Sequence, residues 1–261
     1  MPTNITPGLV FNEAAHKYTR HGKRTTSVTT VINGGIPKNL TAWAARIAAE
    51  KAWELRNMTD QEAFIRIAKD EPNALRDKAG VRGSAIHDIA EKYVHGIPVE
   101  VPEEIYPYVD GYARFLDRFN VQPILTEKSV YLSEFNCAGR FDAIGLIPSL
   151  NDGPVMIDWK TSNGIYKEVK VQTAAYSLAD FYVEPDAPEV EIQLPEVQAT
   201  YVAHITPDGT FLHPLAKNWA EIREHFEFFR AAHRIYTFGL VPHKHVADPI
   251  PAPSIEFEEA S

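Results

Sequence analysis

The sequence predicts an α/β (or α+β) fold, with helices and strands layered around one central sheet. The first observation is size, since 261 residues, 44% of them hydrophobic, suit one globular domain with a sizeable core. The second is that the hydrophobic period switches repeatedly between strand and helix values. The third is the order of segments, in which helices precede three strands, a helix, a strand pair and a final helix.

The N-terminal part is predicted to form strands and then helices. Residues 8–11, 16–20 and 25–32 are rich in Val, Thr, Ile and Tyr around a Gly turn, which is typical of hairpins. Apolar residues then recur at helical spacing from Thr41. The further helices expected in this part span residues 60–69, 73–93 and 103–119.

The C-terminal part is predicted to alternate strands with helices. Strands are expected at 124–132, 137–147 and 155–161, followed by a helix at 170–182, an acidic loop at 184–196 and a hairpin at 197–205 and 210–213. A last helix carries an apolar stripe that begins at Leu215 and ends at Tyr236. Residues 241–261 are Pro-rich and acidic, and are predicted to be a flexible tail.

Composition excludes several classes of protein. The single cysteine, Cys137, excludes an internal disulfide and a four-cysteine metal or iron–sulfur site. The sequence has no apolar run long enough to span a bilayer and no signal peptide, so a cytoplasmic location is expected. The net charge of −9 argues against a nonspecific nucleic-acid coat, although residues 1–100 carry +3 and residues 101–261 carry −12. A local basic lining or bound metal ions would still allow a DNA substrate.

Two carboxylates on neighbouring strands indicate a cation site. Asp158 and Lys160 share one face of the strand 155–161, because side chains alternate along a strand. If strand 137–147 is its antiparallel neighbour, Asp142 lies beside Asp158, and the two charges repel unless a cation bridges them. The alternatives are a solvated salt bridge at Asp158 and Lys160 and a structural Asp142 at a strand end.

Two helical segments supply further candidates. Gly83, His87 and Glu91 share one helix face, where Gly83 would allow close approach to the sheet and His87 could add a nitrogen ligand. Gln172 and Tyr176 share a face of a later helix. The alternatives are a structural histidine and an amide and phenol that serve only in packing.

Together these segments resemble the PD-(D/E)XK nuclease superfamily, above all its RecB-like and phage-exonuclease branch. The shared pattern consists of Gly-x-x-x-His-x-x-x-Glu at 83–91, Gly-x-x-Asp at 139–142, Asp-x-Lys-Thr at 158–161 and Gln-x-x-x-Tyr at 172–176. It covers residues from about 80 to 180. The N-terminal stretch around Phe11, His16-Lys17-Tyr18 and Ser27-Val28-Thr29 also looks like the lead-in of phage-encoded members.

The resemblance implies a restriction-endonuclease-like core, with a mixed central sheet flanked by helices, in a single domain over residues 1–240. Residues 1–72 would be an N-terminal elaboration, residues 73–182 the catalytic core and residues 197–240 a C-terminal hairpin and helix.

The resemblance also assigns roles to residues. Asp142, Asp158 and Lys160 would be catalytic, and His87, Asp142, Asp158 and the Trp159 carbonyl would bind Mg²⁺ or Mn²⁺. Lys160 would orient or activate the attacking water and steady the negative charge that develops on phosphate. The residues expected to bind substrate or support the site are Glu91, Gln172, Tyr176, Arg82 and Arg140.

Several residues keep two interpretations. Glu127 either supports the site or simply begins a strand. Arg82, Arg140, Lys167 and Lys170 either contact phosphates or form a solvated face. The segment His243-Lys244-His245 is a weaker metal candidate.

The sequence departs from the family in having Phe141-Asp142 where the family has Pro-Asp. It has no phosphate-binding loop, so ATP is not expected. With Cys137 as its single cysteine, an iron–sulfur cluster is not expected either.

The function expected from this resemblance is a metal-dependent DNA exonuclease that hydrolyses phosphodiester bonds. It would resect DNA ends in phage-type recombination or repair. A single-strand annealing protein is a possible partner, and no association with membranes is expected. Self-association into a homo-oligomer is possible. The alternatives are a structure-specific DNA endonuclease of the same fold and a non-catalytic DNA-binding or assembly module. The presence of Asp142, Asp158 and Lys160 disfavours the module.

Overall fold

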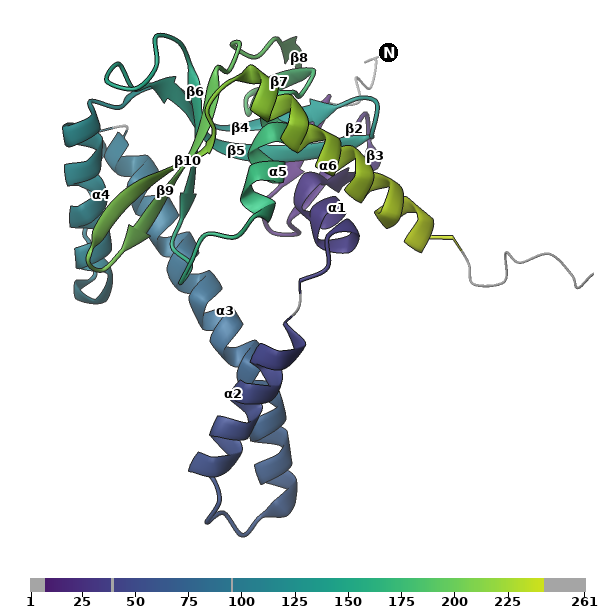
Figure 1. Ribbon diagram of the computed structural model, residues 1–261, viewed down its shortest axis with the longest axis vertical. Helices are drawn as coiled ribbons and strands as arrows, with labels where there is room; N and C mark the ends of the chain where they lie inside the picture. The colour runs from purple at the N-terminus through teal and green to yellow at the C-terminus, as the bar shows by residue number, and fades with distance from the viewer. Residues whose placement is uncertain (1–7, 39, 95, 242–261) are drawn as a thin grey trace, which may run out of the picture.

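The computed structural model describes residues 8–38, 40–94 and 96–241, and these residues form a mixed ten-stranded sheet flanked by helices (Figure 1). This confirms the predicted fold class. The strands are β1 (Leu9–Asn12), β2 (Lys17–Arg20), β3 (Lys23–Ser27), β4 (Gln122–Leu132), β5 (Cys137–Leu146), β6 (Val155–Lys160), β7 (Phe181–Glu184), β8 (Ala187–Ile192), β9 (Ala199–Thr206) and β10 (Gly209–Ala216).

The sheet opens at its centre, where β3 and β6 share one edge of β5. Strand β4 pairs with β5 along its length, and so occupies the other edge. On the shared edge, β3 is parallel to the start of β5 at Cys137 and Ala138, whereas β6 is antiparallel to its end at residues 143–145. No strand of the described chain pairs with residues 139–142 on that edge. The backbone there is therefore free to face a ligand.

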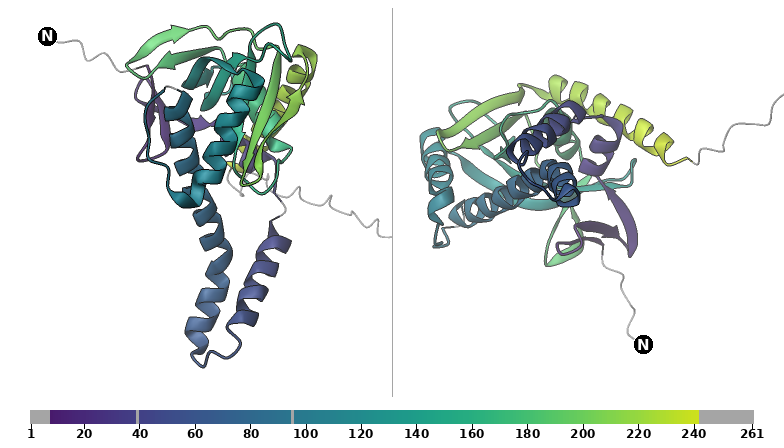
Figure 2. Two further views of the ribbon diagram at one scale, coloured as in Figure 1. Left: turned by 90° about the vertical axis from the view of Figure 1, so that its left-hand side faces the viewer. Right: turned by 90° about the horizontal axis from the view of Figure 1, so that it is seen from below.

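Helices cover both faces of the sheet (Figure 2). Helices α1 (Val28–Gly35), α5 (Glu168–Ser177) and α6 (Trp219–Gly239) share one core with Phe141 and Met156. On the other face, α4 (Tyr106–Phe119), which follows the short η1 (Glu103–Ile105), and the C-terminal half of α3 (Gln61–Val94) pack with Ile157 and Trp159. Apolar side chains thus alternate between two cores along β6, as expected for a strand buried on both faces.

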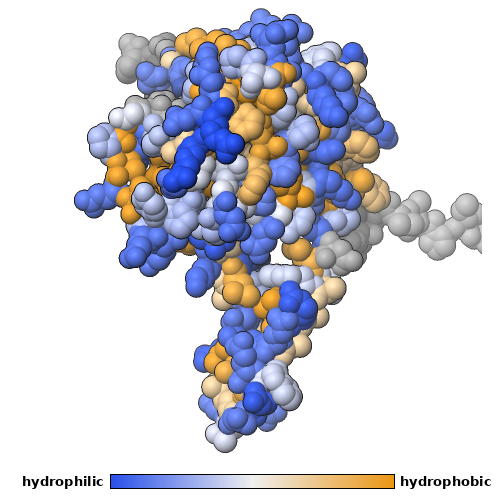
Figure 3. All heavy atoms as spheres, turned by 60° about the vertical axis from the view of Figure 1, so that its left-hand side comes forward, coloured by the Kyte–Doolittle hydropathy of each residue, from blue (hydrophilic) through white to orange (hydrophobic). Residues whose placement is uncertain are grey.

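A helical arm projects from the body. It consists of α2 (Thr41–Glu54) and the N-terminal half of α3, which run side by side (Figures 1 and 2). An ion pair of 3.2 Å between Lys51 and Glu71 joins the two helices. Helix α2 buries none of its residues, and Trp53 is 70% exposed. Figure 3 shows apolar side chains at the surface along this arm.

Several predicted elements are confirmed, and two predictions in the N-terminal half are wrong. The strand predicted at 25–32 ends at Ser27, where α1 begins. The Ser27 side chain caps α1 by accepting a hydrogen bond from the Thr30 N–H, and Val28, Val31 and Ile32 have helical spacing on the buried side. The two helices predicted at 60–69 and 73–93 are one helix, α3, which continues through Pro72.

Three predictions in the C-terminal half are also wrong. The helix predicted at 170–182 ends at Ser177, and the acidic segment predicted as a loop forms β8, which pairs with β7. Leu215 belongs to β10 rather than to the final helix. Each error depends on pairing between strands, which local periodicity does not encode. The predicted tail, with His243-Lys244-His245, lies outside the described residues except for Val241.

No helix of the described segments is long and apolar enough to cross a membrane.

Candidate active site

The opening in the sheet forms the floor of a cleft of about 610 Å³. Strands β1–β3, helix α3, the middle of β5, the end of β6 and helix α5 all contribute to its lining. The cleft is within the size range of small-molecule and cofactor sites. The predicted site residues that line it are His87, Glu91, Arg140, Asp142, Trp159, Lys160, Gln172 and Tyr176.

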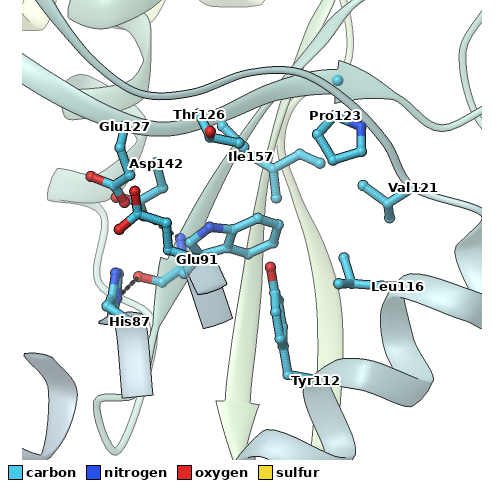
Figure 4. Close-up of a pocket in the computed structure, with 13 residues that line it drawn as sticks. His87, Glu91, Tyr112, Leu116, Val121, Pro123, Thr126, Glu127, Asp142 and Ile157 are labelled. Atoms are coloured by element: carbon cyan, nitrogen blue, oxygen red, sulfur yellow. Dashed lines mark hydrogen bonds between the residues drawn. The ribbon is translucent and has the colours of Figure 1, made fainter. Parts of the chain in front are cut away.

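A group of three potential metal ligands lies at one end of this cleft. One ligand atom each from His87 on α3, Glu127 on β4 and Asp142 on β5 lies within 4.8 Å of the other two. Figure 4 shows the Glu91, Glu127 and Asp142 carboxylates gathered together, with His87 beside them. Tyr112 and Leu116 lie on the apolar side of the same region. The donor set of one imidazole and two carboxylates suits Mn²⁺ or Mg²⁺.

The backbone of Trp159 holds two of these side chains in place. Its N–H donates to Asp142 Oδ2 at 2.6 Å, and its carbonyl oxygen accepts from His87 Nε2 at 3.1 Å. Adjacent ligands of an octahedral ion lie about 3.0 Å apart, because each is about 2.1 Å from the metal. The His87 Nε2 atom and the Trp159 carbonyl oxygen therefore have the spacing of two ligands of one ion, which would take the place of the proton between them.

Glu127 reaches the group through an unusual backbone conformation. It lies between the register pairs Thr126 with Ala143 and Lys128 with Phe141, and so faces Asp142 across the ladder. Its φ of 52° is rare for a residue other than glycine, and strained backbone often occurs at functional sites. In the sequence Glu127 is a single carboxylate inside a strand, so its role is visible only once the register is known.

Electrostatics show that the site is short of positive charge. Burial, together with the charges of Asp142 and Glu91, raises the pKa of Glu127 to about 8 against the lowering effect of Arg140. The Arg140 guanidinium is 2.7 Å from the Glu127 carboxylate. A divalent cation would relieve the remaining repulsion, so the residues present fit such an ion.

Asp158 is placed with Lys160 rather than with the three ligands. Alternation along β6 directs both side chains toward α5 and Trp159 toward α4, where its indole packs edge-on against Tyr112. Lys160 Nζ is 2.6 Å from Asp158 Oδ2. That oxygen accepts no hydrogen bond of good geometry from the described residues. The pKa of Asp158 is raised to about 6, because burial and the charge of Asp142 outweigh the lowering effect of Lys160.

Lys160 keeps its charge in this setting. Burial lowers its pKa, but Asp158 and Asp142 more than offset that effect, so the net shift is upward. The ammonium group is therefore a fixed cation at neutral pH.

Two glycines allow close packing around the cleft. A Cβ on Gly139 would lie 2.2 Å from the Tyr176 ring, and the Tyr176 hydroxyl accepts a hydrogen bond of 3.3 Å from Gln172 Nε2. A Cβ on Gly83 would lie 3.0 Å from Thr161 Oγ1, so the glycine brings α3 against the end of β6. Both agree with the expectation that Gly83 permits approach to the sheet and that Gln172 and Tyr176 line the site.

The predicted cationic residues are in different environments. Arg140 lines the cleft and also approaches Glu13 at 3.4 Å. Arg82 does not line the cleft, and its guanidinium instead lies 5.6 Å from the Tyr108 ring centroid on α4. Lys167 and Lys170 lie at the start of α5, away from the cleft lining.

Comparison with known proteins does not identify a family. No protein-family profile and no curated protein matches this chain. Among solved structures, the crystal structure of SSO0001 is 16% identical, over 82% of this chain and 76% of that chain. Its TM-score of 0.33 is too low to carry an argument about fold or function.

Proposed function

We propose that this protein is a metal-dependent deoxyribonuclease of the PD-(D/E)XK type, and that it acts as an exonuclease. One observation carries the proposal: the His87, Glu127 and Asp142 group lies in a single cleft with Lys160, whose ammonium group is paired with Asp158. Carboxylates, an imidazole and a lysine at one site supply what phosphodiester hydrolysis requires.

Four groups would hold the metal ion. These are the His87 imidazole, the Glu127 and Asp142 carboxylates and the Trp159 carbonyl oxygen. Mg²⁺ or Mn²⁺ bound there would make a water molecule more acidic and withdraw charge from the phosphate. The proposed ligand set differs from the set expected from the sequence, because Glu127 takes the place of Asp158.

Lys160 would act as a cation rather than as a base. Its pKa is raised, so at neutral pH it donates hydrogen bonds to the attacking water and to the phosphate oxygens. Asp158 would orient the ammonium through the 2.6 Å contact. Gln172 and Tyr176 line the same cleft and would position the substrate strand.

The proposed setting is the resection of DNA ends in recombination or repair, beside a single-strand annealing protein. This setting rests on the sequence resemblance alone. A structure-specific endonuclease would use the same residues, and it would differ from the exonuclease in cleaving closed circular DNA.

The test is cleavage of end-labelled linear DNA and covalently closed circular DNA in Mg²⁺, Mn²⁺ or EDTA. We expect loss of linear DNA with either metal, none in EDTA, and circles left intact. Asp142→Ala and Lys160→Ala should each lower the rate at least about 100-fold, because each removes charge stabilisation at the phosphate. Asp77→Ala, on the exposed part of α3, is the matched control and should cleave at the wild-type rate.

Each alternative has its own outcome. Cleavage of circles would replace the exonuclease by an endonuclease. Absence of cleavage in either metal, with DNA binding retained, would refute the enzyme and favour a binding module. Full activity of Glu127→Ala, with its metal affinity unchanged, would return the ligand set to the one expected from the sequence.

A further inference from the structure

The hairpin of β1 and β2 presents an aromatic wall to the cleft. Phe11, His16 and Tyr18, which we call the aromatic wall, all line it. Tyr18 is buried, with its ring centroid 4.6 Å from that of Phe11, and so supports the Phe11 ring. Phe11 is partly exposed and His16 is exposed, with 5.4 Å between their centroids and 70° between their planes. Two rings of different orientation are thus accessible from the cleft.

This wall lies next to the candidate metal site. The Arg140 guanidinium is 5.9 Å from the Phe11 ring centroid, and the same side chain contacts Glu127 at 2.7 Å. Arg140 therefore lies between the aromatic wall and Glu127, which is a proposed metal ligand. Whatever the wall binds is held close to the bond that the proposed function would cleave.

The surroundings of Phe11 are apolar rather than basic. Phe11, Glu127 and Arg140 also line a second cavity of about 140 Å³. Val183, Pro185 and Pro188 form part of its lining, and the charge of Arg140 is matched by Glu127 and Glu13. A phosphate would gain little here, whereas the flat face of a nucleobase can stack on an aromatic ring.

We propose that the aromatic wall stacks an unpaired base of the substrate, so that the substrate is DNA with a single-stranded stretch or a frayed end. Inside a duplex both faces of each base are covered by neighbouring bases, so a ring can stack only on a base at an open end or on one that has left the duplex. The inference rests on the proposed function for the identity of the substrate as DNA. It adds which form of DNA is bound and which residues select it.

The test measures binding without turnover, in EDTA and again in Ca²⁺, by fluorescence anisotropy. The probes are a labelled single-stranded oligonucleotide, the same length of abasic backbone and a blunt duplex of the same sequence. Wild type is compared with Phe11→Leu, which keeps apolar packing on Tyr18, and with Phe11→Tyr, which keeps an aromatic ring. Phe228→Leu is the control, since Phe228 is exposed on α6, outside the residues that line the cleft.

We expect wild type to prefer the single strand over both the abasic backbone and the duplex. Phe11→Leu should weaken single-strand binding on the order of 10-fold, which is the loss of one stacked base, and leave abasic binding unchanged. Phe11→Tyr and Phe228→Leu should bind like wild type. Thermal unfolding of each variant shows whether the hairpin remains folded.

The results separate the failure of this inference from failure of the proposed function. Equal binding of single strand and duplex, or wild-type affinity in Phe11→Leu, would overturn the inference about the aromatic wall. Neither result would bear on the proposed cleavage activity. A loss in Phe11→Leu that is equally large on the abasic backbone would also overturn it, because no base is then involved. Absence of cleavage in metal, with the Phe11-dependent preference intact, would refute the nuclease and keep the binding site.

Discussion

At the scale of single residues, Glu127 has the largest shift in pKa among the candidate metal ligands. Its positive φ and its contact with Arg140 hold the carboxylate against Asp142, in a place where burial disfavours charge. The sequence alone pointed to Asp142, His87 and Lys160 through their motifs. Glu127 carries no such signal, because its role depends on a backbone angle and a cross-strand register.

The pKa of Glu127 predicts how stability depends on pH in metal-free protein. The folded pKa of about 8 exceeds the ordinary value of 4.5, so between these values the folded state holds a proton that the unfolded state releases. Stability should therefore fall as pH rises from about 4.5 to 8. Glu127→Gln removes this charge and should flatten the profile, with a gain on the order of 2 kcal/mol above pH 8.

Urea unfolding in EDTA between pH 5 and 9 measures this effect. Glu62→Gln, on the exposed start of α3, is the control and should leave the slope unchanged. An unchanged slope in Glu127→Gln would show that Glu127 is ionised at neutral pH even without metal.

At the scale of elements, the two halves of α3 have different structural roles. Its N-terminal half belongs to the arm, and its C-terminal half brings His87 to the end of β6. A Cβ on Gly80 would meet no atom within 4 Å, whereas a Cβ on Gly83 would lie 3.0 Å from Thr161 Oγ1. The two glycines therefore form a matched pair within one helix.

Substitution of this pair should give opposite results. Gly80→Ala should raise the free energy of unfolding by about 0.5–1 kcal/mol, because alanine is the better helix former. Gly83→Ala should gain less or nothing, and should lower cleavage by pushing α3 away from Trp159. Denaturant unfolding and single-turnover cleavage measure the two effects. Equal stabilisation by both, with wild-type cleavage, would mean that close approach at Gly83 is not needed.

At the scale of the whole molecule, a body with two large cores, one on each face of the sheet, carries a thin arm. The sheet is covered on both faces, whereas α2 buries none of its residues and is held to α3 by surface contacts such as Lys51 with Glu71. The Lys51 and Glu71 side chains are each 23% exposed, and ion pairs open to solvent contribute little to stability. The arm should therefore open locally at a lower free energy than the body.

Hydrogen exchange followed by mass spectrometry would test this difference. Amides of α2 should exchange at least about 10-fold faster than those of β5 and β6, which lie between two cores. Protection of α2 equal to that of β5 would contradict the expectation.

The sequence by itself determined the alternation of helices and strands, the two strands that carry Asp142 and Asp158, and most of the residues in the cleft. These features follow from local hydrophobic periodicity and from short motifs. Tertiary structure decided that β3 and β6 share one edge of β5, that Glu127 joins His87 and Asp142, and that Asp158 faces Lys160. The physical reason is that strand register and the side chains that meet across an edge are set by pairing between residues far apart in the chain.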